Sequence, residues 1–326
     1  MDRDTWAHIR ARLPQNGIAW PTLFVLVFDM GLLVVSARLS FHDWWAYPLA
    51  WLLEGLALLH LYLIHHETVH GAVFCSPWSN ALLGHGLGAC LLYPFLPRQQ
   101  SHWAHHRWAG HPHGDPTNRR IIARLRSLSV VDGHCIDALW RTWLPFLAFT
   151  ERVALWRAMF AVTASASQPI AKRLLIANAT TAVFWAVLVG TLAWHRLLMH
   201  FLLWYVPGMF FLLVAEELVN LPHHADAPLV ESMKPMEFWR QDEVTHSCQA
   251  LPFWSSAVLL NFNLHTAHHY YPSLPWYRLP LAERLAQQCS PLIRPIQNEM
   301  HWGLQRRKGS FVNLFSHMLK ADSTSD

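Results

Sequence analysis

The chain has 326 residues, of which 53% are hydrophobic and only 14% are charged, and its formal net charge is +4. Soluble domains carry about 25% charged residues, so this deficit argues against an ordinary soluble protein and for a surface that faces lipid. The small charge and the lack of a basic tract or RNA-binding motif give no support for nucleic-acid binding. The five cysteines form no C-x-x-C pair, which argues against thiolate zinc sites, iron–sulfur clusters and a disulfide framework.

In chain order, a polar N-terminal segment of mixed charge precedes four apolar runs, each close to the ~20 residues that a membrane-spanning helix needs. The predicted spans are 20–37, 47–64, 174–194 and 197–218. Short polar breaks join the first span to the second and the third to the fourth, which predicts two helical hairpins. Two shorter apolar runs, at 81–96 and 251–264, contain residues such as Pro, and we expect re-entrant or interfacial helices there.

The basic residues indicate how these hairpins are oriented. With two hairpins, 23 of the 25 Lys and Arg residues lie on one side of the membrane, which the positive-inside rule makes the cytoplasm. We therefore predict an all-α integral membrane protein with four transmembrane helices in two hairpins and a cytoplasmic helical cap. The expected parts are a cytoplasmic segment 1–19, a membrane domain 20–285 and a cytoplasmic tail 286–326. The short chain and the lack of an endoplasmic-reticulum retention signal favour a bacterial inner membrane.

Four histidine clusters fall on the predicted cytoplasmic side: HETVH and NLPHHAD after the second and fourth spans, and SHWAHH and NLHTAHH elsewhere. On a helix, residues i, i+3 and i+4 share a face, so each H-x-x-H-H is expected to present three imidazoles toward one point. Together the clusters offer more ligands than the four that one zinc takes, which indicates two metals with open positions. Neutral imidazoles suit iron, copper, zinc and nickel.

The first cluster also allows a different hypothesis. His66, Glu67 and His70 form H-E-x-x-H, the signature of zinc metalloproteases in which the Glu is the general base. An intramembrane zinc metalloprotease would leave both H-x-x-H-H clusters without a role. A metal transporter would place its ligands within the spans, whereas these clusters are predicted to follow them.

Three of these clusters together resemble the three histidine boxes of the integral-membrane fatty acid desaturase family, with its related hydroxylases and ketolases. They are HETVH at 66–70, HWAHH at 102–106 and HTAHH at 265–269. Gly-Asp-Pro at 114–116 and HHYYPSLPWYRLP at 268–280 are also similar to that family. The resemblance extends over roughly residues 20–285. It implies a diiron centre in the cytoplasmic cap, with the ligands His66, His70, His102, His105, His106, His224, His265, His268 and His269.

Some assignments stay open within this resemblance. His65 is an alternative to His66, and His223 is an alternative to His224, which lies in the N-x-x-x-H context that begins at Asn220. Asn220 is expected to act through a water. The other candidates to hydrogen-bond the ligands are Asp115, Asp242 and Glu243.

The resemblance implies an O2-dependent diiron oxidoreductase that acts on an unactivated C–H bond of a fatty acyl chain, and introduction of a double bond is the leading hypothesis. Hydroxylation, carotenoid ketolation and decarboxylation of a fatty acid to a terminal alkene remain alternatives. HPHG at 111–114 differs from the haem-binding HPGG of cytochrome b5, so no fused electron carrier is expected. Two electrons would come from a separate carrier, such as a ferredoxin or rubredoxin with its reductase.

Four carboxylates lie in or beside the predicted spans: Asp29, Glu54, Glu216 and Glu217. Charged groups there are costly and are often functional. They are candidates to orient the ligand imidazoles or to line a substrate path. For Glu216 and Glu217 we expect instead a position at a helix end or in contact with water.

Overall fold

The computed structural model describes residues 1–14, 17–165, 168–224, 227–230, 234–249, 255–289, 297–298 and 306–322. The chain divides into two compact units. Unit 1 comprises Met1–Gly17, Gln100–Phe146 and Glu217–Asp326, and unit 2 comprises Ile18–Gln99 and Leu147–Glu216. Both units are helical. Within the described ranges, the strands are two residues each, β1 (Cys248–Gln249) and β2 (Gln297–Asn298), and they pair in parallel.

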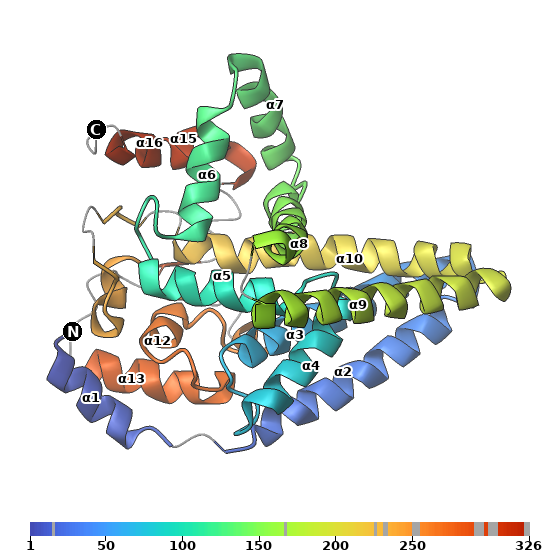
Figure 1. The fold of residues 1–326 in the computed structure, drawn as a ribbon, viewed down its shortest axis with the longest axis horizontal. Coiled ribbons are helices and arrows are strands. Elements are labelled where there is room, and N and C mark those ends of the chain that lie inside the picture. Colours follow the sequence, from blue (N-terminus) through green and yellow to red (C-terminus); the bar gives the residue numbers. More distant parts are fainter. Residues whose placement is uncertain are drawn as a thin grey trace. The chain divides into compact units, whose positions relative to one another are not determined.

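The four predicted spans are confirmed as long apolar helices, so the protein has an all-α integral membrane fold. The spanning segments are Trp20–Leu39, Trp44–Val69, Lys172–Trp194 and Leu198–Asn220. They correspond to α2 (Trp20–Leu39), η1 and α3 (Trp44–Ala46 and Tyr47–Val69), α9 (Gln168–Trp194) and α10 (Leu198–Asn220). Within unit 2, α2 and α3 form one hairpin, and α9 and α10 form the other (Figure 1). Bulky exposed side chains on α2, such as Phe24 and Val27, are the surface that lipid would cover.

The second span is longer than its apolar run predicts. We expected it to end at residue 64, but α3 continues to Val69, and His70 caps its C-terminus. The polar residues from His65 onward include no helix breaker before Gly71, which adopts the left-handed conformation (φ +67°) common just after a helix end. His66 therefore lies inside the helix, not beyond it as predicted.

The shorter apolar runs form shorter helices. The run 81–96 falls largely in α4 (Pro77–Cys90), whose 14 residues are too few to cross a bilayer. In the run 251–264, residues 251–254 lie outside the described residues, and α11 (Ser255–Val258) is a single turn. Neither helix is a candidate span, in agreement with the prediction.

Inside unit 2, α3 is held to its neighbours by polar contacts and close packing. His60 on α3 pairs with Asp29 on α2 at 2.9 Å, and both side chains are buried. On another side, α3 approaches α10 very closely. A Cβ atom added to Gly208 on α10 would lie 2.2 Å from the carboxyl carbon of Glu54 on α3. A glycine at position 208 is therefore required for the buried Glu54 side chain to fit between these helices.

Two ion pairs, one of them fully buried, join further helices of unit 2. Arg98 on α5 (Phe95–Trp108) pairs with Glu151 on α8 (Phe146–Ser165) at 3.0 Å. Arg152, also on α8, pairs with Glu216 on α10 at 2.7 Å. Both guanidinium groups lie over the ring of the buried Tyr93. Glu216 lies near the end of α10, as expected, but it is only 2% exposed, so the expected contact with water is wrong.

Unit 1 has one apolar cluster around α12 (His265–Tyr270) and α13 (Leu279–Cys289). The buried Tyr270, Tyr271 and Leu274 pack against residues of α13 and of α1 (Arg3–Arg12), which lies along it in Figure 1. The 3-10 helix η4 (Trp276–Arg278) leads into α13. This packing anchors α12, which is only six residues long and carries the third histidine box.

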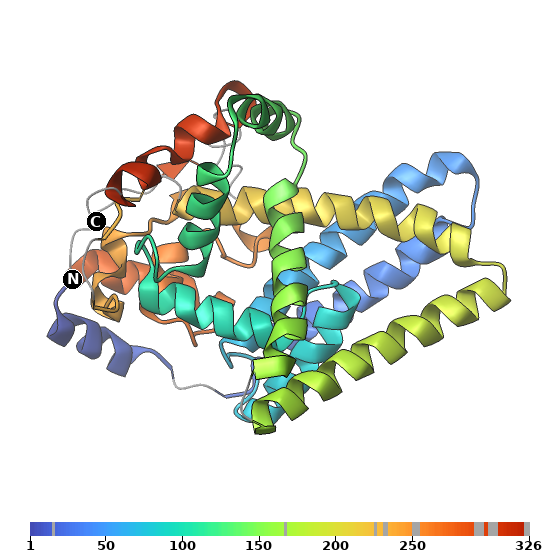
Figure 2. The same ribbon diagram turned by 45° about the horizontal axis from the view of Figure 1, so that its top comes forward.

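The rest of unit 1 surrounds a second aromatic cluster, formed by Trp140, Phe146 and Phe311. The C-terminal helices α15 (Phe311–Phe315) and α16 (His317–Asp322) pack against α7 (Val130–Arg141) and α6 (Pro116–Arg126), as Figure 2 shows. Between α10 and α12 the chain forms the 3-10 helices η2 (Leu221–His223) and η3 (Phe238–Glu243).

Candidate metal centre

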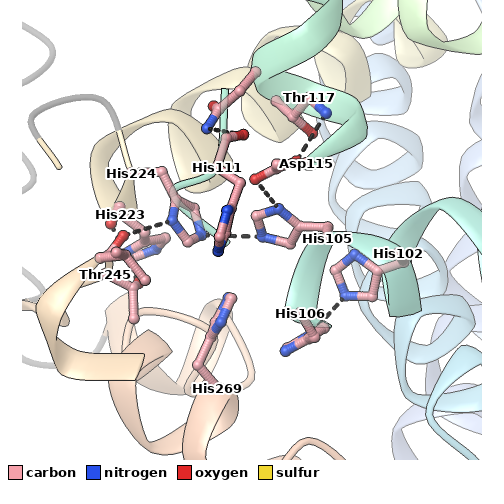
Figure 3. Close-up of polar contacts among 12 residues, drawn as sticks. His102, His105, His106, His111, Asp115, Thr117, His223, His224, Thr245 and His269 are labelled. Atoms are coloured by element: carbon pink, nitrogen blue, oxygen red, sulfur yellow. Dashed lines mark hydrogen bonds and ion pairs between the residues drawn. The ribbon is translucent and has the colours of Figure 1, made fainter. Parts of the chain in front are cut away.

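Unit 1 brings seven histidines together from three separate stretches of the chain: α5, the turn after α10, and α12. They form two groups, and within each group the ligand nitrogen atoms all lie within 4.8 Å of one another. Group A comprises His102, His106 and His268, and group B comprises His105, His224, His265 and His269. Figure 3 shows several of them converging. All are buried apart from His224, which is partly buried.

Each H-x-x-H-H box is divided between the two groups, which corrects the expectation that all three of its imidazoles face one point. In the second box, His102 and His106 belong to group A and His105 to group B; in the third, His265 and His269 belong to group B and His268 to group A. A helix turns about 100° per residue, so i and i+4 lie only about 40° apart, whereas i+3 lies about 60° to the other side of i. Two such helices facing one another therefore supply two neighbouring sites.

The hydrogen bonds of the outer nitrogens fix how three of the four rings of group B are protonated. His105 Nδ1 lies 2.9 Å from the Asp115 carboxylate, and His224 Nδ1 lies 3.2 Å from the Val244 carbonyl. His269 Nδ1 lies 2.9 Å from the side-chain oxygen of Gln241. Because these partners accept hydrogen bonds, each Nδ1 carries the proton and each Nε2 presents a lone pair.

The Nε2 atoms of group B lie close together. The Nε2 atoms of His105 and His224 are 3.2 Å apart, those of His224 and His265 are 3.0 Å apart, and those of His265 and His269 are 3.1 Å apart. The Nε2 atoms of His105 and His224 both carry lone pairs, which repel each other unless a cation lies between them. Nitrogens that share a metal at about 2.1 Å are about 3.0 to 3.4 Å apart, so the spacing and protonation of group B fit a bound metal ion.

Group A has the same spacing. His106 Nε2 lies 3.2 Å from His102 Nε2 and 3.1 Å from His268 Nε2. The first pair comes from one turn of α5, and the second joins residues 162 positions apart in the chain. Three imidazoles leave positions free for further ligands on a metal bound there.

Burial lowers the pKa of several of these imidazoles, which favours metal binding. Burial, reinforced by the neighbouring histidines, holds the pKa of His224, His265 and His269 well below the usual value. A histidine binds a metal only in its neutral form, so a lowered pKa keeps the ligands available at neutral pH. The all-nitrogen donor set suits iron, copper, zinc or nickel rather than calcium or magnesium.

The members of both ambiguous pairs have different neighbours in the structure. The ring of His223 stacks on His265 with centroids 4.2 Å apart, and its Nδ1 donates to the carbonyl of His246, so His224 is the residue whose nitrogen joins group B. In unit 2, the rings of His66 and His70 lie 4.8 Å apart, one helical turn from each other.

His65, the alternative to His66, points elsewhere in unit 2. Its ring lies against Tyr93 and Phe95, with centroid separations of 5.6 and 5.8 Å. Glu67, the general base of the protease hypothesis, accepts a hydrogen bond from Thr22 on α2 at 2.8 Å. This contact gives Glu67 a role in joining α2 to α3.

The residues predicted to hydrogen-bond the ligands lie in different places. Asp115 contacts a ligand, since one of its oxygens binds His105 while the other accepts the Thr117 backbone N–H at the start of α6. Asp242 is buried and interacts with the Tyr270 hydroxyl, whose pKa is raised mainly by burial. Glu243 forms an ion pair with Arg240, at 2.6 Å. Asn220 is the last residue of α10.

Gln241 is a side-chain contact of the ligands that the sequence does not predict. It is fully buried in η3; its side-chain oxygen accepts from His269 and its amide nitrogen donates to the carbonyl of His106, at 2.8 Å. Glutamine does not titrate and belongs to no recognised motif, and it lies 28 residues before His269. No signal in the single sequence distinguishes it from the neighbouring polar residues.

Comparison with known proteins agrees with this geometry. The family model described as "Fatty acid desaturase" matches residues 42–298. The chain is 24% identical over 304 residues to the omega-3 fatty acid desaturase of the endoplasmic reticulum of Vigna radiata, covering 86% of this chain and 76% of that protein. It is 22% identical over 298 residues to the temperature-sensitive sn-2 acyl-lipid omega-3 desaturase (ferredoxin), chloroplastic, of Arabidopsis thaliana, covering 86% of this chain and 67% of that protein.

A bacterial relative is comparably similar. The dihydrorhizobitoxine desaturase of Bradyrhizobium elkanii is 25% identical over 259 residues, which cover 76% of this chain and 69% of that protein. The family model spans more than half of the chain and includes every histidine of both groups. The chain belongs to the fatty acid desaturase family.

Proposed function

We propose that this protein is an O2-dependent diiron desaturase that introduces a double bond into a fatty acyl chain. The observation that carries the proposal is the pair of histidine groups, in which the Nε2 atoms of neighbouring rings lie 3.0–3.2 Å apart. Two adjacent all-histidine sites are the arrangement needed for two irons. The names of the Vigna and Arabidopsis relatives support the substrate class, since they name a fatty acid and an acyl lipid. The name of the Bradyrhizobium relative gives a different substrate, dihydrorhizobitoxine.

The proposed ligands are the nine histidines of the sequence hypothesis. Seven are the members of groups A and B, and the resemblance to the family's first histidine box adds His66 and His70 from the end of α3. A pair of irons bound by these residues would supply the reduction of dioxygen and the removal of hydrogen from an unactivated C–H bond. No protein side chain can remove such a hydrogen as a base, because an alkyl C–H is not usefully acidic.

The residues around these ligands hold their imidazole rings in a form that can bind metal. Asp115 and Gln241 hold the protons of His105 and His269 on Nδ1, which leaves Nε2 of each ring for the metal. Burial holds the pKa of His224, His265 and His269 well below the usual value, which keeps these three imidazoles neutral. These residues thus orient and maintain the donor atoms before substrate arrives.

The overall reaction balances with an external reductant. A –CH2–CH2– unit gives up two hydrogen atoms and becomes –CH=CH–, while dioxygen becomes two waters. Dioxygen needs four electrons, of which the substrate supplies two and a separate carrier supplies two, along with two protons from solvent. A ferredoxin or rubredoxin with its reductase is the proposed donor, and the name of the Arabidopsis relative, which includes ferredoxin, supports that class.

We also propose that the metal centre faces the cytoplasm of a bacterial inner membrane. The distribution of basic residues supports this orientation through the positive-inside rule. An acyl chain would then enter among the spans while its head group stays near the cytoplasmic surface.

The alternative of an intramembrane zinc metalloprotease has less support. It uses a single metal with His66 and His70 as ligands, and it gives no function to the seven histidines of groups A and B. Family membership also argues against it.

The test combines metal and product analysis. The full chain is purified in detergent and its metal content measured, with about two irons per chain expected. It is also expressed in a bacterial host together with a ferredoxin and its reductase, and lipid extracts are analysed by gas chromatography–mass spectrometry. New unsaturated acyl chains support the proposal. Hydroxylated chains, ketolated carotenoids or terminal alkenes would replace the desaturase with another enzyme of the same chemistry, and one zinc per chain would reject the diiron centre.

A further inference from the structure

Gln241 lies in η3, between the second and third histidine boxes in the chain, and its side chain hydrogen-bonds to both. η3 packs directly against α12. The Gln241 side chain is fully buried, with its amide nitrogen 2.8 Å from the His106 carbonyl and its oxygen 2.9 Å from His269 Nδ1. His106 belongs to group A and His269 to group B.

The orientation of this amide follows from its partners. A backbone carbonyl can only accept a hydrogen bond, so the –NH2 end of Gln241 must face His106. The oxygen then faces His269 and can only accept, which places the imidazole proton on Nδ1 and the lone pair on Nε2. The backbone of the second box thereby determines, through one side chain, which nitrogen of a third-box histidine is free.

We propose that Gln241 is a positioning residue that couples the two metal sites. It fixes the tautomer of His269 in group B, and it ties that ring to the backbone of His106 in group A. This inference rests on the proposed function, because it assumes that both groups bind metal.

Asp115 also supports a ligand, but its contacts differ from those of Gln241. Asp115 supports one ligand, His105 of group B, with a carboxylate that also caps α6. Gln241 supports His269 with a neutral acceptor and, in addition, contacts the helix that carries His102 and His106. We therefore expect loss of Gln241 to weaken metal binding at both sites.

The experiment measures Fe(II) binding by the full-length protein in detergent, by anaerobic competition with a chelator. Gln241→Met keeps the length of the side chain but removes both hydrogen bonds, and Gln241→Asn keeps an amide that is too short to reach both partners. Loss of such a hydrogen-bonding partner typically weakens metal binding about 10- to 100-fold. We expect a loss in this range for Gln241→Met, affecting both irons, and a similar or smaller loss for Gln241→Asn.

A third variant tests the role of the oxygen. Gln241→Glu retains an acceptor at His269 and should bind iron more tightly than Gln241→Met. The control is Asn80→Leu in unit 2, which removes another buried amide that bonds only to backbone, at Val73, Phe74 and Ser76. It should lower the thermal stability while the folded protein keeps its iron affinity.

The outcomes separate this inference from the proposed function. If the unaltered protein fails to bind two irons, the proposed function fails. If the unaltered protein binds two irons and Gln241→Met or Gln241→Asn binds them equally well, only the role of Gln241 is overturned. A Gln241→Glu variant as weak as Gln241→Met would also overturn it, because the oxygen at His269 would then have no effect.

Discussion

Arg306 and Glu217 form a buried ion pair that joins the C-terminal segment of unit 1 to the end of α10. Both residues are less than 5% exposed, and they are 89 positions apart in the chain. The same guanidinium donates to the carbonyls of Trp140 and Leu144 and lies over the Trp140 ring at 4.2 Å. Glu217, like Glu216, was expected to lie at a helix end or in water; it does lie near the end of α10, but it is buried and paired.

Replacing Arg306 should destabilise the protein strongly. Arg306→Ala leaves the Glu217 carboxylate buried without its cation, and breaking one side of a buried pair costs roughly 3–5 kcal/mol. Thermal unfolding in detergent measures the loss, and Arg307→Ala, at an exposed neighbour, is the control that should change little. Replacing both partners, as in Arg306→Met with Glu217→Leu, should recover part of the stability. Equal melting temperatures for Arg306→Ala and Arg307→Ala would contradict this account.

Asp115→Asn should weaken metal binding without removing the helix cap. The Asn side chain can still accept from the Thr117 N–H, but it withdraws the negative charge that supports the protonated Nδ1 of His105. We expect iron affinity to fall by about 10- to 100-fold. Asp132→Asn is the matched control, because Asp132 bonds Ser129 at the start of α7 and contacts no ligand. Unchanged affinity in Asp115→Asn would show that this carboxylate does not support the metal centre.

His66 and His65 should respond differently to substitution. His66→Ala should lower the iron content and abolish product formation, because His66 is a proposed ligand. His65→Phe should retain iron, because its ring packs against Tyr93 and Phe95. Metal analysis of both purified variants, together with lipid profiling, decides between them. Iron loss in His65→Phe with retention in His66→Ala would exchange their roles.

Acid should destabilise the metal-free protein. The pKa of His224, His265 and His269 is held well below the usual value in the folded state, so below pH ~6.5 the unfolded chain binds more protons than the folded one. Stability is therefore unaffected by these groups above that pH, and it falls as the pH drops toward their folded-state pKa values, by up to about 1.4 kcal/mol per pH unit for each group.

Thermal unfolding of the metal-free protein in detergent between pH 8 and pH 5 checks this expectation. Replacing His265 and His269 together by Leu should flatten the dependence, because two of the three groups are then absent. A melting temperature that stays constant or rises on acidification would contradict the expected sign.

Much of the architecture could be predicted from local pattern. The four spans follow from hydropathy, and the helical placement of His102, His105 and His106 follows from their spacing along α5. The predicted end of the second span is wrong, because the apolar composition stops at residue 64 whereas backbone geometry at Gly71 limits the helix α3. Hydropathy reports where a helix meets lipid, not where its hydrogen bonding ends.

The spans, the histidine boxes and hence the metal-binding character of this protein can be predicted without its structure, because these properties depend on composition and on spacing within a single helix. Tertiary structure decided how each box is divided between two sites, and which acceptor holds each imidazole proton. It also decided that Glu216 and Glu217 are buried and paired. The physical reason is that hydrogen bonds and ion pairs act only over about 3 Å, and they join residues as distant in the chain as His106 and His268. No periodicity in the sequence encodes which distant segments meet, so Gln241 became visible only in the folded protein.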